Sequence, residues 1–238
     1  MHQIEISDFT IDVVRKSIKN MHLSVYPPTG RVRIAAPLNI DDEAVKLFAI
    51  SKLAWIKKNQ RKFEKQDRQS PRAFEERESH FFQGRRYLLR VSEHDAPPKV
   101  IIKTKNHIDL FVRPNTNILQ RQIILNEWYR KQLKNQIPIL IEKWEKIIEV
   151  SVSDWGVKRM KTKWGTCNIE QQRIWLNLEL AKKPLHCLEY ILVHEMIHLL
   201  ERHHNDKYIK LIDHFMPKWR QFRDELNNLP VAHTDWEY

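Results

Sequence analysis

The chain has 238 residues, of which 42% are hydrophobic and 30% are charged, and its net charge at pH 7 is +11. This length and composition suit one globular domain, or a catalytic domain with an appendage, and exclude a largely disordered chain or a small disulfide-stabilised module. The apolar runs are much shorter than the ~20 residues of a transmembrane helix, and no signal peptide is recognisable at the start. We therefore expect a cytoplasmic protein that does not enter membranes.

The positive charge is distributed unevenly along the chain. Basic residues exceed acidic ones in residues 1–183, whereas residues 184–238 are slightly acidic. Such an excess attracts polyanions, including nucleic acid and nucleotides. A solvated basic face that binds nothing is the alternative, because no zinc-finger or aromatic RNA-binding motif accompanies the charge. The charge therefore permits a nucleic-acid contact without requiring one.

The N-terminal segment begins with short runs rich in β-branched and aromatic residues, separated by turn residues. These runs predict strands over 9–14, 21–26 and 31–35. Acidic residues then precede an amphipathic stretch with a basic end, the charge order that favours a helix. The pattern predicts one helix over about 42–66.

An exposed connector is expected at 67–79, followed by further strands. Apolar runs between turn residues predict these strands over 81–91, 100–104 and 108–113. We therefore expect residues 1–116 to form a β-rich portion that contains one long helix.

Helical periodicity returns over about 117–149, where Pro138 is expected to kink or divide the helix. Two strands are then predicted, over 157–166 and 173–178. Pro184 stands at a helix-opening position before a long apolar stretch. The C-terminal part is therefore expected to contain a helix, a pair of strands and a second helix.

The run His194-Glu195-Met196-Ile197-His198 carries the most specific chemistry in the chain. On a helix, residues four apart lie on one face about one turn apart, so both imidazoles can bind one Zn²⁺ ion. The carboxylate of Glu195 then lies beside the open coordination position and can take a proton from a water molecule that the metal activates. Two satisfied core histidines and an exposed glutamate are the alternative, although burying such groups in an apolar helix is costly.

A catalytic zinc ion needs a third protein ligand, for which His203 and His204 are the nearest candidates. On a continuing helix neither would reach the metal, so the helix must end soon after His198. The following polar residues offer such an end, with Asn205 as the cap of a new helix. We expect His204 to be the ligand, because its spacing from His198 is that of metzincins. Those enzymes have glycine where this chain has Glu201, so the turn after His198 must be built differently here. The alternative is that neither His203 nor His204 binds a metal ion and that the two residues only form part of a polar loop.

Four side chains are candidates for substrate binding. Arg159, Lys161 and Lys163 alternate along the predicted strand beside the active helix and would share one of its faces. They can bind substrate phosphates or stabilise an oxyanion, or they can be ordinary solvent-facing cations. Tyr208 can reach the cleft as a hydrogen-bond donor, and a packing role is its alternative.

Several segments together resemble the YgjP-like metallopeptidase-domain family, which is related to SprT-like proteins and other zincins. They are the run Lys161–Cys167, the strand Ile174–Asn177, the helix Leu188–His198, the pair His204-Asn205, and Tyr208. The sequence Trp164-Gly165-Thr166-Cys167 is similar to the Trp-Gly-Ser-Cys signature of that family, with threonine in place of serine. The resemblance implies a zincin-like core with His194, His198 and His204 as zinc ligands and Glu195 as the general base.

The order of the elements predicts an α+β protein with a β-rich portion, 1–116, packed on a C-terminal unit, 117–238, and the resemblance implies that this unit is zincin-like and catalytic. The predicted function is a zinc-dependent metallopeptidase acting on peptides. The alternative is a metal-dependent nucleoside triphosphate pyrophosphatase, an activity also attributed within the family. A second alternative is a non-catalytic zinc-containing binding module, in which a fourth protein ligand closes the site.

Overall fold

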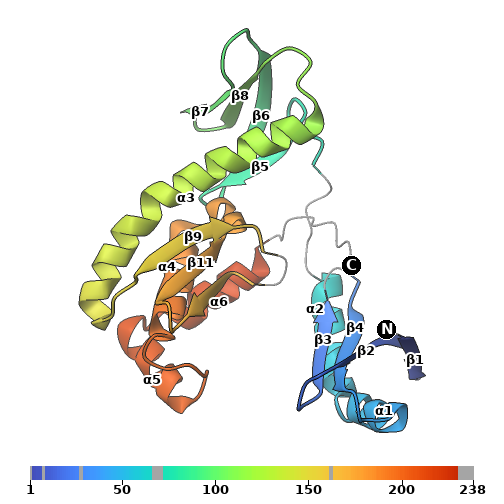
Figure 1. The fold of residues 1–238 in the computed structure, drawn as a ribbon. Coiled ribbons are helices and arrows are strands. Elements are labelled where there is room, and N and C mark those ends of the chain that lie inside the picture. The colour runs from blue at the N-terminus through green and yellow to red at the C-terminus, as the bar shows by residue number, and fades with distance from the viewer. Residues whose placement is uncertain (1, 7–8, 27–28, 66–71, 161–162, 230–238) are drawn as a thin grey trace. The chain divides into compact units, whose positions relative to one another are not determined.

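The computed structural model divides into two compact units, Met1–Arg68 and Gln69–Tyr238. Both units combine sheets and helices, which confirms the predicted α+β class (Figure 1). None of the helices in the described part of the chain combines the length and the apolar character needed to cross a membrane. The described residues are 2–6, 9–26, 29–65, 72–160 and 163–229.

The first unit is a four-stranded sheet with two helices. Its elements are β1 (His2–Ile6), β2 (Phe9–Lys16), β3 (His22–Tyr26), β4 (Arg31–Pro37), α1 (Asp42–Ser51) and α2 (Leu53–Lys65). The strand order is β1-β2-β4-β3, with the central pair β2 and β4 parallel and the outer pairs antiparallel. Alternate strand residues such as Ile11 and Ile34 form one apolar core with Val45 of α1 and Ile56 of α2.

The predicted single helix over 42–66 is wrong, because the chain forms two helices that meet at Lys52. The hydroxyl of Ser51 donates a hydrogen bond to the Phe48 carbonyl at 2.7 Å, and the Lys52 N–H bonds to the Ala49 carbonyl at 3.0 Å. Both bonds reach only three residues back, and side-chain bonds of this kind bend a helix. The helix therefore ends its first segment at Ser51 and starts again at Leu53.

The second unit begins with another four-stranded sheet. Its strands are β5 (Ser79–Phe82), β6 (Arg85–Glu93), β7 (Lys99–Thr104) and β8 (His107–Val112). Their order, β5-β6-β8-β7, and the parallel central pair repeat the pattern of the first sheet. The predicted strand over 81–91 is wrong, since Gln83 and Gly84 have φ angles of 48° and 78°. Two successive positive φ angles form a tight hairpin turn, which separates β5 from β6.

The long helix α3 (Ile118–Ile148) contacts both sheets of this unit, and Figure 1 shows it running from the β5–β8 sheet past the next one. It begins with a capping box in which Asn117 and Gln120 bond to each other's backbone. Of the two expected effects of Pro138, a kink or a division, the division does not occur, because the helix continues through this residue. Pro138 lies on the exposed side, while Ile137 and Ile141 beside it are buried on the core side. Packing of that core side offsets the missing N–H bond.

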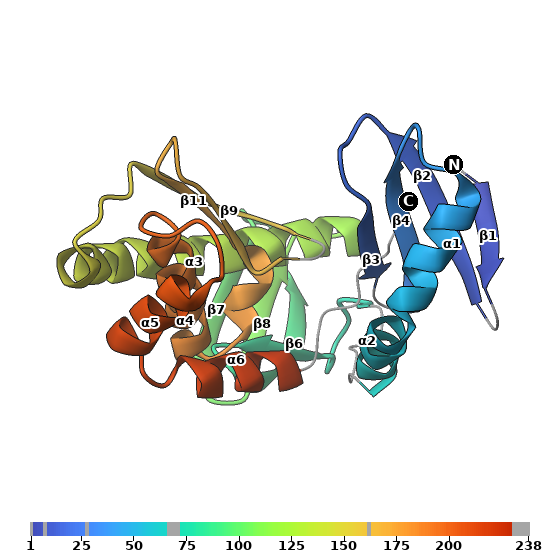
Figure 2. The same ribbon diagram turned by 90° about the horizontal axis from the view of Figure 1, so that it is seen from below.

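The remaining elements surround the segment His194–His198. They are β9 (Asp154–Lys158), β10 (Gly165–Asn168), β11 (Arg173–Asn177), the 3₁₀ helix η1 (Leu178–Lys182), α4 (Leu185–Ile197), α5 (Asp206–Phe215) and α6 (Trp219–Asn228). The strands form a three-stranded sheet of order β10-β11-β9. The predicted strand over 157–166 is wrong, because β9 ends at Lys158 and β10 begins only at Gly165. Helix α4 contacts α5, α6 and the sheet, as Figures 1 and 2 show.

The division between the two units differs from the one expected at 116/117. One continuous core joins Leu89 and Leu110 of the β5–β8 sheet to Leu133 of α3 and Leu192 of α4. Strands β5 to β8 therefore belong to the same compact unit as the segment His194–His198. The reason is that α3 packs against both sheets, so the second β-rich segment cannot be separated from the C-terminal elements.

Candidate metal centre

Helix α4 places His194 and His198 one turn apart on one side. The helix begins directly after Pro184, and almost every side chain of its second half is buried. Such an all-round apolar helix is held in the interior, which fixes the direction in which its few polar side chains point. The ring centroids of His194 and His198 are 5.0 Å apart.

The chain reverses directly after α4 through a turn built by Glu201. The Nδ1 atom of His198 lies 3.0 Å from the Glu201 carbonyl, which can only accept a hydrogen bond. The Glu201 carboxylate accepts a bond from the His203 N–H at 3.2 Å and lies 3.4 Å from the Lys207 ammonium. The side chain of Glu201 thus organises this turn where a metzincin uses glycine.

The reversal returns His204, and not His203, to the two helix histidines. Asn205 caps α5 by accepting a bond from the Tyr208 N–H at 3.0 Å, as the sequence predicts. The Nε2 atoms of His204 and His194 are then 3.1 Å apart, and the ring centroids of His204 and His198 are 4.7 Å apart. His203 is exposed and lies outside this cluster.

The surroundings of the two helix histidines disfavour their protonation. Burial, together with the neighbouring His198 and His204, lowers the pKa of His194 to about 3. Burial also lowers the pKa of His198, against the opposing effect of its bond to Glu201. Neutral imidazoles can bind a metal ion without first releasing protons.

The donor set fits a divalent metal ion. Two nitrogen ligands of a tetrahedral zinc ion lie about 3.3 Å apart, close to the 3.1 Å between the Nε2 atoms of His194 and His204. The Nδ1–H of His198 is engaged by the Glu201 carbonyl, which leaves its Nε2 lone pair available. Within the described residues this cluster contains three possible ligands and no fourth. Three protein ligands with one open position are typical of catalytic zinc sites.

Glu195 lies beside the cluster and is 6% exposed. Burial raises the pKa of its carboxyl group to about 8, and the positive charge of Lys163 opposes this increase. The carboxylate lies against β10 at Gly165, where an added Cβ atom would be only 2.7 Å from Oε1 of Glu195. The strand can approach the carboxylate this closely because Gly165 has no side chain.

A cleft of about 1110 Å³ opens over His194, Glu195, His198 and His204. Part of the cleft is lined by β10, which is the edge strand of its sheet, and by the residues on either side of this strand. The other lining residues belong to α4, the turn after it and part of α6. The candidate metal site therefore lies in the lining of an open cleft.

The predicted substrate-binding residues are not all brought to this groove. Lys163 lines it. Arg159 is exposed and is not among the lining residues, and Lys161 lies outside the described residues. Tyr208 is buried, and its hydroxyl group contacts His194. Arg159 and Lys163 do not share a strand face, because β9 ends at Lys158 and β10 begins only at Gly165.

A family model described as YgjP-like, metallopeptidase domain, matches residues 19–229. The chain belongs to the YgjP-like family. The match covers most of the first unit and the whole described part of the second, which confirms the resemblance inferred from the motifs. A comparison with curated proteins finds no match. Family membership indicates a metal-dependent peptidase domain, and the three-histidine cluster supplies a site for the metal.

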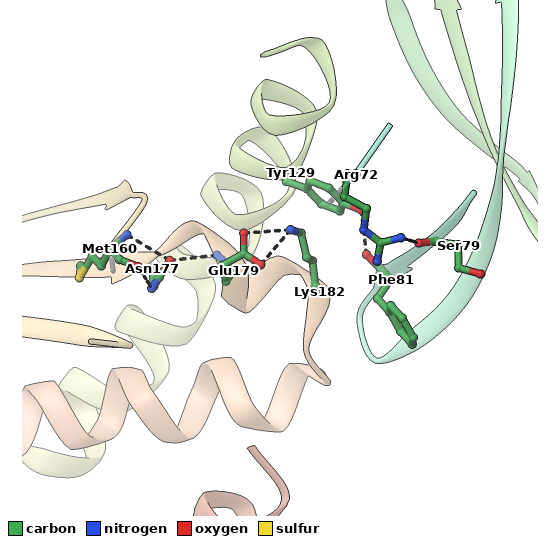
Figure 3. A network of polar contacts seen from close by, with 8 residues as sticks. All are labelled: Arg72, Ser79, Phe81, Tyr129, Met160, Asn177, Glu179 and Lys182. Atoms are coloured by element: carbon green, nitrogen blue, oxygen red, sulfur yellow. Dashed lines mark hydrogen bonds and ion pairs between the residues drawn. The ribbon is translucent and has the colours of Figure 1, made fainter. Parts of the chain in front are cut away.

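In this YgjP-like domain, Asn177 is a site-organising residue that the motif analysis missed. Its Nδ2 group donates to the Met160 carbonyl at 2.9 Å, and its Oδ1 atom accepts from the Glu179 N–H (Figure 3). The same Nδ2 group donates to the Lys163 carbonyl at 2.7 Å. Asn177 thus ties Met160 and Lys163, which both belong to the β9–β10 connection, to the end of β11, and it holds the backbone of Lys163 beside the cleft. A polar residue at the end of an apolar strand is the only sequence signal for this role.

Replacing Gly165 of the YgjP-like signature by alanine is expected to lower hydrolysis by about 100-fold while zinc remains bound. The added methyl group displaces the Glu195 carboxylate, and a displacement of about 1 Å of a reacting group has effects of this size. Activity and zinc content of the purified variant measure the two effects separately. The matched control is Gly156→Ala, which meets the ring of Trp175 and not Glu195. Equal losses in both variants would contradict the assigned role of Gly165.

Proposed function

We propose that the chain is a zinc-dependent metallopeptidase with His194, His198 and His204 as zinc ligands and Glu195 as the general base. The observation that carries this proposal is the meeting of three imidazoles beside a buried carboxyl group in the lining of an open cleft. Zinc suits a three-nitrogen site of this size.

The reaction divides between the metal and the chain's own side chains. Zinc, when bound, polarises the scissile carbonyl and lowers the pKa of a water molecule. The Glu195 carboxylate takes the proton of the attacking water and passes it to the leaving amine. The ammonium group of Lys163, which lines the cleft, stabilises the negative charge on the tetrahedral carbon's oxygen. The positive charges of Lys163 and of a bound zinc ion would oppose the effect of burial on the pKa of Glu195 and favour its carboxylate form.

The shape of the groove favours a peptide over a nucleotide. An edge strand that lines a cleft offers backbone groups to an extended peptide, which can pair with it as an additional strand. Of the expected cations, Lys163 lines the cleft and Arg159 does not; Arg202 and Arg223 also line it, so the preference for a peptide rests on the edge strand and not on a lack of positive charge. A closed structural zinc site is disfavoured because the described residues provide three ligands and an open position.

The test is a panel assay with zinc-loaded protein, with and without a chelator. Unfolded proteins, DNA-bound proteins and each nucleoside triphosphate are incubated separately, with magnesium or manganese added in parallel. We expect peptide fragments from at least one protein substrate, lost on chelation and restored by zinc. The DNA-bound proteins test whether the basic excess directs the enzyme to substrates on nucleic acid. Pyrophosphate release without peptide cleavage would instead establish the nucleotide hydrolase.

A further inference from the structure

Tyr208 contacts all three histidines of the candidate metal site. Its ring centroid lies 5.3 Å from that of His194, 4.9 Å from that of His198 and 4.7 Å from that of His204. The side chain is 1% exposed, and the Asn205 cap fixes the first turn of α5 from which it projects. The three imidazoles are therefore packed around one buried aromatic ring.

The hydroxyl group of Tyr208 makes two contacts, both with His194. It lies 2.7 Å from Nδ1 of the imidazole and 3.2 Å from the backbone carbonyl of the same residue. The carbonyl can only accept, so the single hydroxyl proton is donated to it. The hydroxyl oxygen must then accept the second bond, which requires a proton on Nδ1. In this arrangement the Nε2 atom of His194 keeps its lone pair, and this is the atom that faces His204.

We propose that Tyr208 is a positioning residue that holds His194 in the tautomer and orientation needed to bind the metal. This inference rests on the proposed metal site and assigns to Tyr208 the role of orienting His194, the first of its three ligands. Partners of this kind on the far nitrogen of a ligating histidine fix the ring and increase its basicity. His198 receives the same support from the Glu201 carbonyl, so the two helix ligands are oriented by groups of the returning chain.

A direct role of Tyr208 on substrate fits the structure less well. The residue is absent from the lining of the cleft, and its hydroxyl proton is already donated to the carbonyl of His194. A hydroxyl group used in this way cannot also donate to a substrate oxyanion. The side chain thus acts through His194 and the packing of the cluster.

The test is Tyr208→Phe, which keeps the ring and removes only the hydroxyl group. We expect the zinc dissociation constant, measured by competition with a chromophoric chelator, to rise by about 10- to 100-fold. The visible absorption bands of the cobalt-substituted protein should also change, because they report the ligand geometry and not the stability of the fold. Tyr129→Phe is the matched control, since Tyr129 is equally buried and its hydroxyl donates to the Phe81 carbonyl at 2.9 Å (Figure 3).

Three outcomes would overturn the inference. In the first, Tyr208→Phe binds zinc as tightly as the wild type and its cobalt spectrum is unchanged. In the second, Tyr208→Phe weakens zinc binding by the same factor when His194 has already been replaced by alanine. A residue that acts through His194 should have no further effect on zinc binding in that variant. In the third, the wild type binds zinc no better than His194→Ala; the proposed metal site is then wrong, and the role of Tyr208 is rejected with it.

Discussion

Replacing Glu195 by glutamine is expected to lower hydrolysis by about 10²- to 10⁴-fold while the bound zinc is retained. Glutamine keeps the shape of the side chain, but its amide group cannot take the proton of the attacking water. Glu195 lies outside the three-histidine cluster, so its replacement leaves every metal ligand in place. Peptide cleavage and elemental analysis of the same preparation measure the two quantities.

The matched control for this substitution is Glu189→Gln on the same helix. Glu189 binds Lys143 and the indole N–H of Trp144, and it does not line the cleft. It should keep its activity per folded molecule. Glu195→Gln with wild-type cleavage would exclude Glu195 as the general base.

Removing a ligand imidazole is expected to have the second large effect. His194→Ala and His204→Ala should each lose stoichiometric zinc on dialysis, because a site of three ligands cannot keep its affinity with two. Zinc binding stabilises only the folded state, so added zinc should raise the unfolding temperature of the wild type but not of these variants. Elemental analysis and thermal unfolding with and without zinc give both results.

His203→Ala serves as the control for the third ligand. His203 is exposed and lies outside the cluster, whereas His204 lies 3.1 Å from His194. The His203 variant should therefore retain its zinc. Loss of zinc from His203→Ala together with its retention by His204→Ala would show that the third ligand is assigned to the wrong residue.

Local sequence patterns were sufficient to predict the part of the site that lies on one helix. The spacing of His194 and His198 acts within a single turn, and the opening of the helix after Pro184 and the Asn205 cap are likewise local. The α+β class followed from the order of the elements. Each of these features depends on residues within a few positions of one another, whose geometry the helix itself sets.

Where several local signals competed, the sequence predicted the wrong boundaries. The hydrogen bond of the Ser51 hydroxyl group marks the end of α1 within a stretch whose periodicity predicted one continuous helix. Core packing keeps α3 continuous through Pro138. The apparent strand over 157–166 contains both the end of β9 and the start of β10, since apolar runs do not show where a sheet partner stops.

Only the tertiary structure decided which distant groups meet at the site. It selects His204 over His203, brings Gly165 against Glu195, and places Tyr208 behind His194. These contacts join α4 to β10 and α5, and their distances depend on how the separate elements pack. A periodic pattern shows which face of an element is buried but not what it meets there. For this reason the helical half of the metal site follows from the sequence alone, and the rest of it follows from the packing.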